Sequence, residues 1–391
     1  MNQKTKWQQK QIGDVCEVQK GKTPRREWYA DNGVQIIKFR DLTPAGIVWT
    51  NKHNGFVPDQ YAPALKPLVV GMTLVGADAH NPEYIGKKVC FVDNLPSSPI
   101  FFSGELIAFS PKDNSVIDRR WLYFWLKSPS GYEAMQKQVV GMHLNSNPAK
   151  SILIPIPPLA EQKRIVQMLE RQLVTVEKAR IAAEKRLSEA NALSAATLRA
   201  VFSPIKPLKW QQKQIGEVCN FQFGERITKS RDSGTKYPVY GGGGESFRTD
   251  NFNRQNEYVI SRFAMSPQCV RFVSGKFWLL DSGGTFCIQP QYNGIVMKDF
   301  VNLLLLGMQK YIYAMSRGQG QQNLDVAKFK KMPIPLPPPE EQRRILNLLG
   351  QQLPVTGKVK VVAAAELDKI NALPAAFLRA AFSVPSSVSE T

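Results

Sequence analysis

Four loops rich in basic and amide side chains are the part of this sequence best suited to binding chemistry. Arg and Lys side chains suit guanine edges and phosphates, whereas Asn and Gln suit adenine. Two loops come early, at residues 20–26 and 223–229, and two come late, at 141–147 and 317–323. One such loop is more often a solvated turn, but four at matched places favour contacts to nucleic acid. The candidate DNA-binding residues are Lys20, Lys22, Thr23, Arg25, Arg26, Lys38, Arg40, His143, Asn145, Asn147, Arg226, Lys229, Arg231, Tyr240, Gly242, Gly243, Arg248, Arg317, Gln319, Gln321, Gln322 and Asn323.

Two further motifs depart from the binding patterns they are similar to. Segment 81–84, Asn-Pro-Glu-Tyr, is similar to the Asn-Pro-Pro-Tyr motif of amino-methyltransferases, but its third residue differs. Because no cofactor-binding glycine motif follows a strand upstream, a turn is favoured. Segment 240–245, Tyr-Gly-Gly-Gly-Gly-Glu, lacks the closing Lys-Ser/Thr of a phosphate-binding loop. It is interpreted as a flexible loop that lets the backbone approach a ligand such as DNA.

No residues are spaced for catalysis or metal binding. His53, His80 and His143 have no mutual spacing for a metal, the five cysteines form no CxxC pair, and no Ser-His-Asp set is arguable. The prediction is a protein that is not an enzyme and that binds no metal or cofactor itself.

Composition favours a polyanionic partner. The chain has 391 residues, enough for two or more domains, and 43% of them are hydrophobic. A formal net charge of +19 favours nucleic acid over a membrane surface, which would need a basic amphipathic helix with a large apolar face. No apolar run predicts a transmembrane span, and the N-terminus lacks the apolar core of a signal peptide. With cysteines that suit reduced thiols, a cytoplasmic protein is expected.

The sequence contains one unit twice. The phrase Lys-Trp-Gln-Gln-Lys-Gln-Ile-Gly-Asp-Val-Cys at 6–16 returns at 209–219 with Glu for Asp, an offset of 203. The phrase Ile-Pro-Ile-Pro-Pro-Leu-Ala-Glu-Gln-Lys-Arg-Ile at 154–165 returns in similar form at 334–345, an offset of 180. The chain is therefore two copies of one unit, and the first is 23 residues longer between these landmarks.

Each copy is expected to be a mixed domain followed by a long helix. Short β-branched and aromatic runs predict the strands, and compact apolar runs predict a buried helix in each domain. The expected strands are 34–39, 72–75, 88–92, 101–109, 257–260, 270–273 and 285–288, and the expected short helices are 120–126 and 300–306.

The proline-rich phrases start the two long helices. Proline is tolerated in a first helical turn, and the acidic Glu161 and Glu341 there favour the helix dipole. The residues from 161 to about 200 are strong helix formers. Matching phrases at 198–203 and 378–383 end the helices, and Pro204 and Pro207 terminate the first.

A 3,4-spaced apolar seam runs along both helices in the same register. It predicts that the helices pack on each other, although packing on their own domains is the alternative. Arg180 and Lys360 interrupt the two seams at the same place, and Pro354 between Gly350 and Gly357 predicts a kink in the second helix. The seam positions are Val166, Leu169, Leu173, Val176, Arg180, Ala183, Leu187 and Ala190, then Leu346, Leu349, Leu353, Thr356, Lys360, Ala363, Leu367 and Ile370.

The predicted boundaries follow from these landmarks. They are a first domain at 1–152, a first helix at 153–203, a second domain at 204–332, a second helix at 333–383 and a disordered tail at 384–391.

The paired Ile-Pro-x-Pro-Pro phrases, each opening a long helix after a divergent domain, resemble those of specificity subunits of type I restriction–modification systems. The turn at 21–24 and the stretch at 238–243 are also similar to phrases of that family. The resemblance implies an α+β fold with a pseudo-two-fold internal repeat. Two mixed α/β target recognition domains would each read half of a split DNA site, separated by two long helices packed as an antiparallel coiled coil.

The same resemblance implies partners and where they dock. It implies two DNA-adenine methyltransferase subunits, and restriction subunits for cleavage, with S-adenosylmethionine, ATP and Mg²⁺ bound by those partners. The helix starts would dock the partners through Pro157, Pro158, Glu161, Gln162, Pro337, Pro338, Glu341 and Gln342.

Two rival functions remain open at this point. One is a methyltransferase that carries its own recognition domains, against which the missing cofactor motif speaks. The other is a basic RNA-binding repeat protein, which competition between duplex DNA and structured RNA would discriminate.

Overall fold

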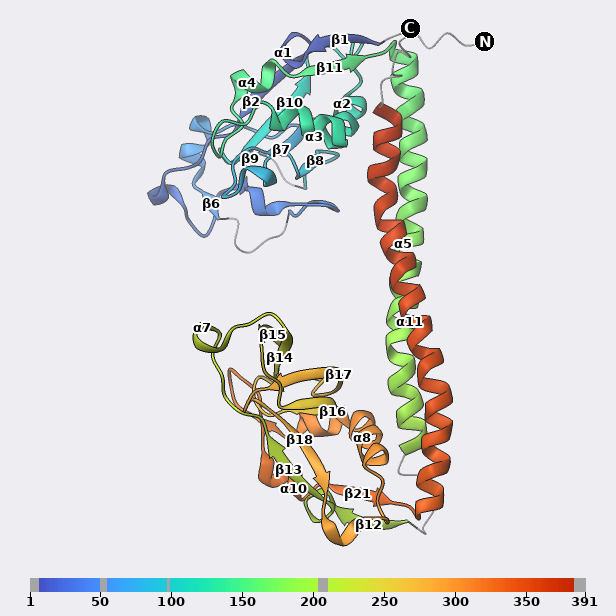
Figure 1. Cartoon of the computed structure of the whole chain (residues 1–391). Coiled ribbons are helices and arrows are strands. Elements are labelled where there is room, and N and C mark those ends of the chain that lie inside the picture. The colour runs from blue at the N-terminus through green and yellow to red at the C-terminus, as the bar shows by residue number, and fades with distance from the viewer. Residues whose placement is uncertain (1–6, 50–54, 97–98, 203–209, 383–391) are drawn as a thin grey trace, which may run out of the picture. The chain divides into compact units, whose positions relative to one another are not determined.

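The computed structural model describes residues 7–49, 55–96, 99–202 and 210–382 and divides into two compact units (Figure 1). The first unit comprises residues 1–182 and 368–391, and the second comprises 183–367. Each unit therefore holds a mixed domain together with parts of both long helices. The expected tail at 384–391, and the expected terminators Pro204 and Pro207, lie outside the described residues, as does His53.

Small sheets and short helices build the domain of the first unit. One sheet has the order β2-β10-β7-β8, another has the order β6-β3-β9, and β4 pairs with β5. The elements are β1 (Gln8–Gln11), α1 (Ile12–Val15), β2 (Cys16–Lys20), β3 (Val34–Ile37), β4 (Leu42–Thr43), β5 (Gly46–Ile47), β6 (Phe56–Val57), β7 (Thr73–Gly76), β8 (Val89–Phe91), β9 (Ile100–Phe102), β10 (Leu106–Pro111), α2 (Arg119–Lys127), α3 (Pro129–Gln136), α4 (Ser146–Lys150) and β11 (Leu153–Ile156), with 3₁₀ turns at Arg26–Trp28, Phe39–Asp41, Asp59–Ala64 and Pro82–Tyr84.

The single strand predicted at 101–109 is wrong. The chain forms β9, which pairs in parallel with β3, and then β10, which pairs antiparallel with β2 and β7. The two strands are separated by a turn that closes around Gly21. The N–H of Gly21 donates to the Leu106 carbonyl over 2.9 Å, and a Cβ on Gly21 would lie 2.1 Å from the Ser103 carbonyl oxygen. This close backbone approach requires glycine and divides the predicted strand.

The other local predictions in this domain are confirmed. The strands expected at 34–39, 72–75 and 88–92 are β3, β7 and β8. The turn expected at 81–84 is present, because the Asn81 side chain accepts a hydrogen bond from the Glu83 N–H over 2.9 Å.

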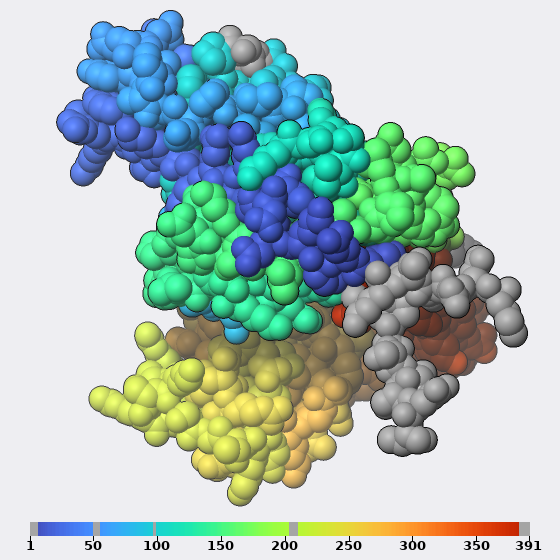
Figure 2. Space-filling model, turned by 90° about the horizontal axis from the view of Figure 1, so that it is seen from above, coloured from blue at the N-terminus to red at the C-terminus, as the bar shows by residue number. Residues whose placement is uncertain are grey.

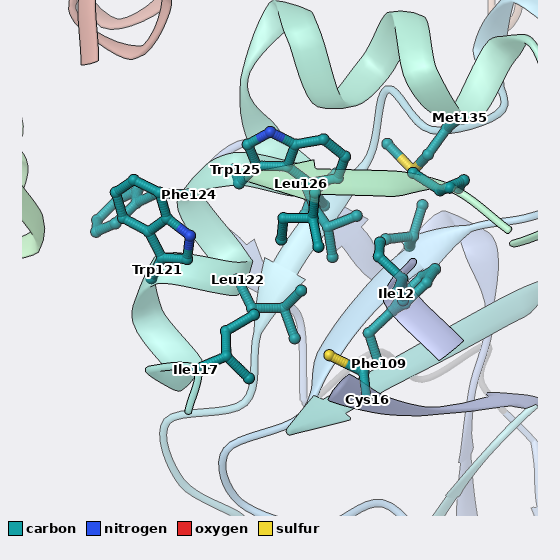
Figure 3. Packing of buried hydrophobic residues seen from close by; sticks show 14 of the residues in the cluster. Ile12, Cys16, Phe109, Ile117, Trp121, Leu122, Phe124, Trp125, Leu126 and Met135 are labelled. Atoms are coloured by element: carbon teal, nitrogen blue, oxygen red, sulfur yellow. The ribbon is translucent and has the colours of Figure 1, made fainter. Parts of the chain in front are cut away.

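The helix expected at 120–126 is α2, and it forms the centre of the first core. Its Trp121, Leu122, Phe124, Trp125 and Leu126 are buried, and Figure 3 shows them beside residues such as Phe109 and Ile12. The Asp118 carboxylate caps the helix by accepting the N–H groups of Arg120 and Trp121. The Trp121 ring also lies 4.8 Å from the ring of Phe382, near the end of the second long helix.

The domain of the second unit repeats this plan around one larger sheet of order β13-β18-β16-β17-β14-β15. The predicted strands at 257–260, 270–273 and 285–288 lie within β16, β17 and β18, and the predicted helix at 300–306 lies within α8. The elements are β12 (Gln211–Gln214), α6 (Ile215–Val218), β13 (Cys219–Phe223), α7 (Lys229–Asp232), β14 (Tyr237–Gly241), β15 (Gly244–Thr249), β16 (Arg254–Ser261), β17 (Val270–Leu279), β18 (Gly283–Ile288), a 3₁₀ turn at Pro290–Tyr292, α8 (Lys298–Gly307), α9 (Gln309–Ala314), β19 (Ser316–Arg317), β20 (Asn323–Leu324), α10 (Val326–Lys330) and β21 (Pro333–Leu336).

The two repeated phrases of each copy pair with each other in space. Strand β1 pairs antiparallel with β11, and β12 pairs in the same way with β21. In Figure 2 the blue residues of the first phrase adjoin green residues of the later segment. The chain therefore enters and leaves each domain through one two-stranded ribbon.

The long helices are α5 (Leu159–Phe202) and α11 (Pro339–Phe382), each of 44 residues. In the second unit, Arg186 is paired with Glu366 at 2.6 Å, and the hydroxyls of Ser194 and Thr356 lie 2.7 Å apart. From Arg186 to Ser194 the residue number in α5 rises, whereas the number of the residue contacted in α11 falls from 366 to 356. The two helices are therefore antiparallel (Figure 1). The predicted packing of the helices on each other is confirmed.

Burial along the seam follows the predicted 3,4 spacing. Leu169, Ala183, Leu349 and Ala363 are buried, whereas the predicted interruption at Lys360 is exposed. Residues 186 and 366 are equivalent under the offset of 180, so one ion pair joins matching positions of the two copies. Helix α11 continues through Pro354 as one element.

Two glycines of α11, Gly350 and Gly357, lower the stability of the helix, and alanine at these positions should raise it. A Cβ on Gly350 or Gly357 would meet no atom within 4 Å, and neither residue has a positive φ. We expect Gly350→Ala with Gly357→Ala to raise the free energy of unfolding by about 1–2 kcal/mol, because alanine loses less backbone entropy in a helix. Urea denaturation measures the change.

The matched control is Gly131→Ala in α3. Its Cβ would lie 2.1 Å from the Trp125 carbonyl oxygen, so this change should destabilise the protein. Equal effects of the α11 and α3 substitutions would contradict the packing described.

Candidate nucleic-acid interface

Two of the predicted residues of the first domain, Lys20 and His143, contact Asp78, and a third, Asn145, contacts Lys20. The Lys20 ammonium donates to Asp78 Oδ1 over 2.7 Å and to Asn145 Oδ1 over 3.0 Å. His143 Nδ1 lies 3.0 Å from the same Asp78 oxygen. Lys20 ends β2, Asp78 follows β7, and the other two lie in the loop before α4. The Lys20 N–H also donates to Ser146 Oγ over 3.1 Å, which ties this loop to the strand end.

Lys38 and Arg40 occupy a different place, beside Tyr29 and Asp41. The Lys38 ammonium lies 4.2 Å from the centre of the Tyr29 ring, and burial, with the nearby Arg40 charge, lowers the Lys38 pKa. Arg40 is exposed. Glu105 joins this segment to the Asp78 group, because its carboxylate accepts the Phe39 N–H and its carbonyl accepts the Asp78 N–H.

The loop after β2 exposes most of the remaining candidates of this domain. Lys22, Arg25 and Arg26 are exposed, and the Arg25 guanidinium lies 5.5 Å from the Trp28 ring centre. Thr23 is partly engaged, because its hydroxyl accepts the N–H of Gly104 over 3.1 Å. Asn147, in α4, is exposed as well.

The two glycines predicted to bind DNA, Gly242 and Gly243, lie in the hairpin between β14 and β15 and differ in exposure. Gly242 is buried, its N–H donates to Ser282 Oγ over 3.2 Å, and its carbonyl accepts from Ser261 and Arg271. The N–H and the carbonyl of Gly242 are thus both bonded within the protein. The prediction that this backbone is open to a ligand is wrong for Gly242. Gly243 is exposed, and a Cβ there would meet nothing within 4 Å, so it is the glycine that a ligand can reach.

The remaining basic candidates of the second domain gather around α7. Arg226, Lys229 and Arg231 are exposed, and the Arg248 guanidinium donates to the Lys236 carbonyl over 2.9 Å. Nearby, the Tyr240 hydroxyl donates to Glu245 over 3.3 Å. A polar pocket of about 260 Å³ adjoins α7 and is lined by Ile227, Arg231, Asp232, Ser233, Thr249, Asp250, Asn251 and Trp278.

The amide-rich segment 317–323 forms the turn between β19 and β20. Arg317, Gln319 and Gln321 are exposed at this turn. Gln322 and Asn323 instead face the loop 262–265 after β16, through the Gln322 carbonyl to the Met265 N–H at 2.8 Å and through Asn323 Oδ1 to the Ala264 N–H at 3.4 Å.

The structure thus brings together loops that the sequence treats separately. Ser282 accepts the N–H groups of Arg262 and Phe263 through its carbonyl and that of Gly242 through its hydroxyl. The glycine hairpin, loop 262–265 and the 317–323 turn therefore form one surface. Sequence reasoning missed Asp78 and Arg262 because the usable signal, their place in the equivalent loops after β7 and β16, requires the two copies to be aligned in space.

Both glutamines assigned to partner docking are buried. Gln162 Oε1 accepts the backbone N–H of Asp118 over 2.8 Å, and Nε2 donates to the carbonyls of Val116 and Pro157. Gln342 does the same in the other unit, where it accepts the Met297 N–H over 2.9 Å. Asp118 and Met297 precede α2 and α8, so each glutamine joins the start of a long helix to the start of a domain helix.

The other docking candidates differ in exposure. Pro157 and Pro337 are buried, whereas Pro158 and Pro338 are exposed. Glu161 is paired with Arg164 at 2.7 Å, and these hydrogen bonds lower the Glu161 pKa. The corresponding pair, Glu341 with Arg344, is 3.5 Å apart. Similar charged surfaces therefore lie at both helix starts.

Within the described residues, no helix is long and apolar enough to cross a membrane, and no three His, Cys, Asp or Glu side chains gather as metal ligands. All five cysteines are free. Burial raises the pKa of the Cys16 and Cys219 thiols to about 12.

Replacing Gln162 should weaken the contact between the start of α5 and the segment before α2. We expect Gln162→Leu to lower the free energy of unfolding by about 2–4 kcal/mol, because buried backbone groups lose their partners. Gln342→Leu should have a similar effect in the second unit. Thermal and urea denaturation measure both. Lys163→Gln at the exposed neighbour should change little, and a similarly small effect of Gln162→Leu would refute this structural role.

Two mixed domains of one design, carried on an antiparallel pair of long helices, define a tandem-repeat architecture in which two copies present corresponding loops. The model of the type I restriction modification DNA specificity domain matches this chain twice, at residues 4–185 and 207–352. The chain belongs to this family, and the resemblance carried by its repeated phrases is confirmed.

Known relatives agree with the family. The MjaVIII specificity subunit of Methanocaldococcus jannaschii is 24% identical over 170 residues, which are 42% of this chain and 39% of that relative. The EcoBI specificity subunit of Escherichia coli is 20% identical over 398 residues, which cover 90% of this chain and 80% of that subunit.

Solved structures share the fold. One chain from work on complex assembly and conformational transition of the type I R-M system has a TM-score of 0.73 at 19% identity, with 98% of this chain and 99% of that chain covered. The HsdS subunit of Thermoanaerobacter tengcongensis has a TM-score of 0.53 at 19% identity, with 98% of each chain covered. The predicted fold class is confirmed.

Proposed function

We propose that this chain reads a bipartite DNA target on behalf of a type I restriction–modification complex and performs no catalysis itself. The observation that carries the proposal is the contrast between shared and divergent parts of the two copies. The strand ribbons, the buried glutamines and the helix ends are the same in both. The loops that bear the basic and amide side chains differ, as two readers of different half-sites require.

The partners follow from the same contrast. Two similar surfaces at the helix starts, with Pro158, Glu161 and Arg164 on one and Pro338, Glu341 and Arg344 on the other, suit two copies of one partner. We infer that these partners are DNA-adenine methyltransferase subunits, joined by restriction subunits for cleavage. These partner subunits would bind S-adenosylmethionine, ATP and Mg²⁺. A cytoplasmic location suits such partners.

Mapping of DNA methylation tests the function directly. Cells that carry the partner methyltransferase, with and without this chain, are compared by methylome sequencing. We expect methylated adenines in one split sequence only when the chain is present. Methyl transfer from labelled S-adenosylmethionine by the purified chain alone would overturn the non-catalytic role. Preference for structured RNA over duplex DNA in competition would overturn DNA as the ligand.

Helix length should set the gap between the half-sites. Helix α5 has 44 residues, on the order of 66 Å at about 1.5 Å per residue. Four residues inserted after Ala182, about one turn, should lengthen it by ~6 Å. Since DNA rises about 3.4 Å per base pair, the unread spacer should grow by one or two base pairs.

Methylation mapping of the insertion variant measures the spacer. Four residues inserted between Ile205 and Lys206 add nothing to the described lengths of α5, which ends at Phe202, or of α11. This variant serves as the control and should leave the spacer unchanged. An active α5 insertion variant that still modifies only the original spacer would exclude the helix as a ruler.

A further inference from the structure

The side chain of Arg262, directly after β16, lies against two aromatic rings. Its guanidinium carbon lies 4.4 Å from the centre of the Phe223 ring and 4.7 Å from that of the Phe263 ring. Phe223 ends β13 and is 38% exposed, so the stack reaches the surface. Contacts with two rings restrict the plane of the guanidinium while leaving its N–H edge free.

The donors of this guanidinium remain available for a ligand, as far as the described residues are concerned. The hydrogen bonds of Arg262 among the described residues come from its backbone, whose N–H donates to the Ser282 carbonyl and whose carbonyl accepts the Leu324 N–H, each at 2.8 Å. In the part of the chain that the structure describes, no acceptor or carboxylate binds its side chain. Two other arginines of this domain, Arg254 and Arg271, differ because they donate to protein oxygens.

The loop that carries Arg262 is also strained and fixed. Ala264 has a φ of 49°, a left-handed conformation that is unfavourable for a residue with a side chain. The Ala264 N–H is nevertheless bonded by Asn323 Oδ1 over 3.4 Å, from the amide-rich turn. Strain that the surroundings maintain in this way is typical of loops that bind ligands.

The equivalent place in the first domain is where Lys20, His143 and Asn145 meet Asp78. The backbone bonds correspond, since the Leu144 N–H donates to the Ala77 carbonyl over 2.8 Å as the Leu324 N–H donates to that of Arg262. Lys20 and Phe223 end equivalent strands, at the offset of 203. By these bonds Arg262 is equivalent to Ala77, and Phe263 is equivalent to Asp78. The same loop of the fold thus carries an ion-paired carboxylate in one copy and, at the neighbouring position, a stacked arginine in the other.

We propose that Arg262 reads a guanine in the half-site of the second domain. This inference rests on the proposed DNA-reading function. A planar guanidinium with a free edge donates two hydrogen bonds to O6 and N7 of guanine in the major groove, and no other base presents that pair of acceptors. The stack on Phe223 and Phe263 sets the direction of this edge before DNA arrives, so the contact selects sequence in addition to neutralising charge.

The test is methylation mapping, with the partner methyltransferase, of Arg262→Gln and Arg262→Lys variants. Glutamine pairs with adenine, so Arg262→Gln should shift one guanine position of one half-site toward adenine or relax it. Modification of the original sequence relative to that one-base variant should fall by on the order of tenfold to a hundredfold. Lys310→Gln removes a charge from exposed Lys310 on α9 and should leave the target unchanged.

Arg262→Lys keeps the charge above the rings but loses the forked donor pair. Because lysine can still donate to guanine, this variant should weaken selection at the same guanine position less than Arg262→Gln does. Its binding to unrelated duplex DNA should stay within twofold, which separates base reading from folding. An unchanged target, or equal weakening of all positions in both half-sites, would overturn the role of Arg262 and leave the proposed function standing. A wild-type chain that directs no bipartite methylation would overturn both.

Discussion

Each domain core is completed by the start of one long helix and the end of the other, and the rest of the structure depends on this exchange. In the first unit, Gln162 of α5 and Phe382 of α11 both contact the region of α2. In the second unit, Gln342 of α11 and Phe202 of α5 contact α8 or its lead-in. Neither helix can move without opening a core, so the antiparallel pairing is built into the folding of both domains.

This constraint explains which residues recur. Gln162 and Gln342 bond mostly to backbone groups, which are present whatever the side chains, so the same amide serves two domains of different sequence. The ribbon of β1 with β11 likewise depends on backbone pairing. The loops that these shared backbone contacts support can differ in sequence between the copies. The loop after β7 carries Asp78, paired with Lys20, whereas the equivalent loop after β16 carries Arg262, stacked on Phe223. Identity between the copies therefore marks the scaffold.

Periodicity and repetition in the sequence predicted the fold well, because the seam of α5 and α11 and the proline-rich starts are local patterns. What they missed depends on distant contacts. The break in the strand predicted at 101–109 follows from the approach of Gly21, some 80 residues earlier. Burial of Gln162 follows from the loop before α2. Among the site candidates, Lys20, His143 and Asn145 do come together, but the carboxylate that joins them was not visible as a motif.

The covalent joining of two diverged copies has a consequence for symmetry. A dimer of identical chains is two-fold symmetric, and the sites it prefers are palindromes that look the same in either direction. Here the helix pair keeps the pseudo-two-fold frame, as the Arg186–Glu366 pair at equivalent positions illustrates, while the two reading surfaces differ. A DNA site read by two different surfaces is asymmetric, because its two half-sites differ in sequence. The chain bound to such a site therefore has a polarity along the duplex.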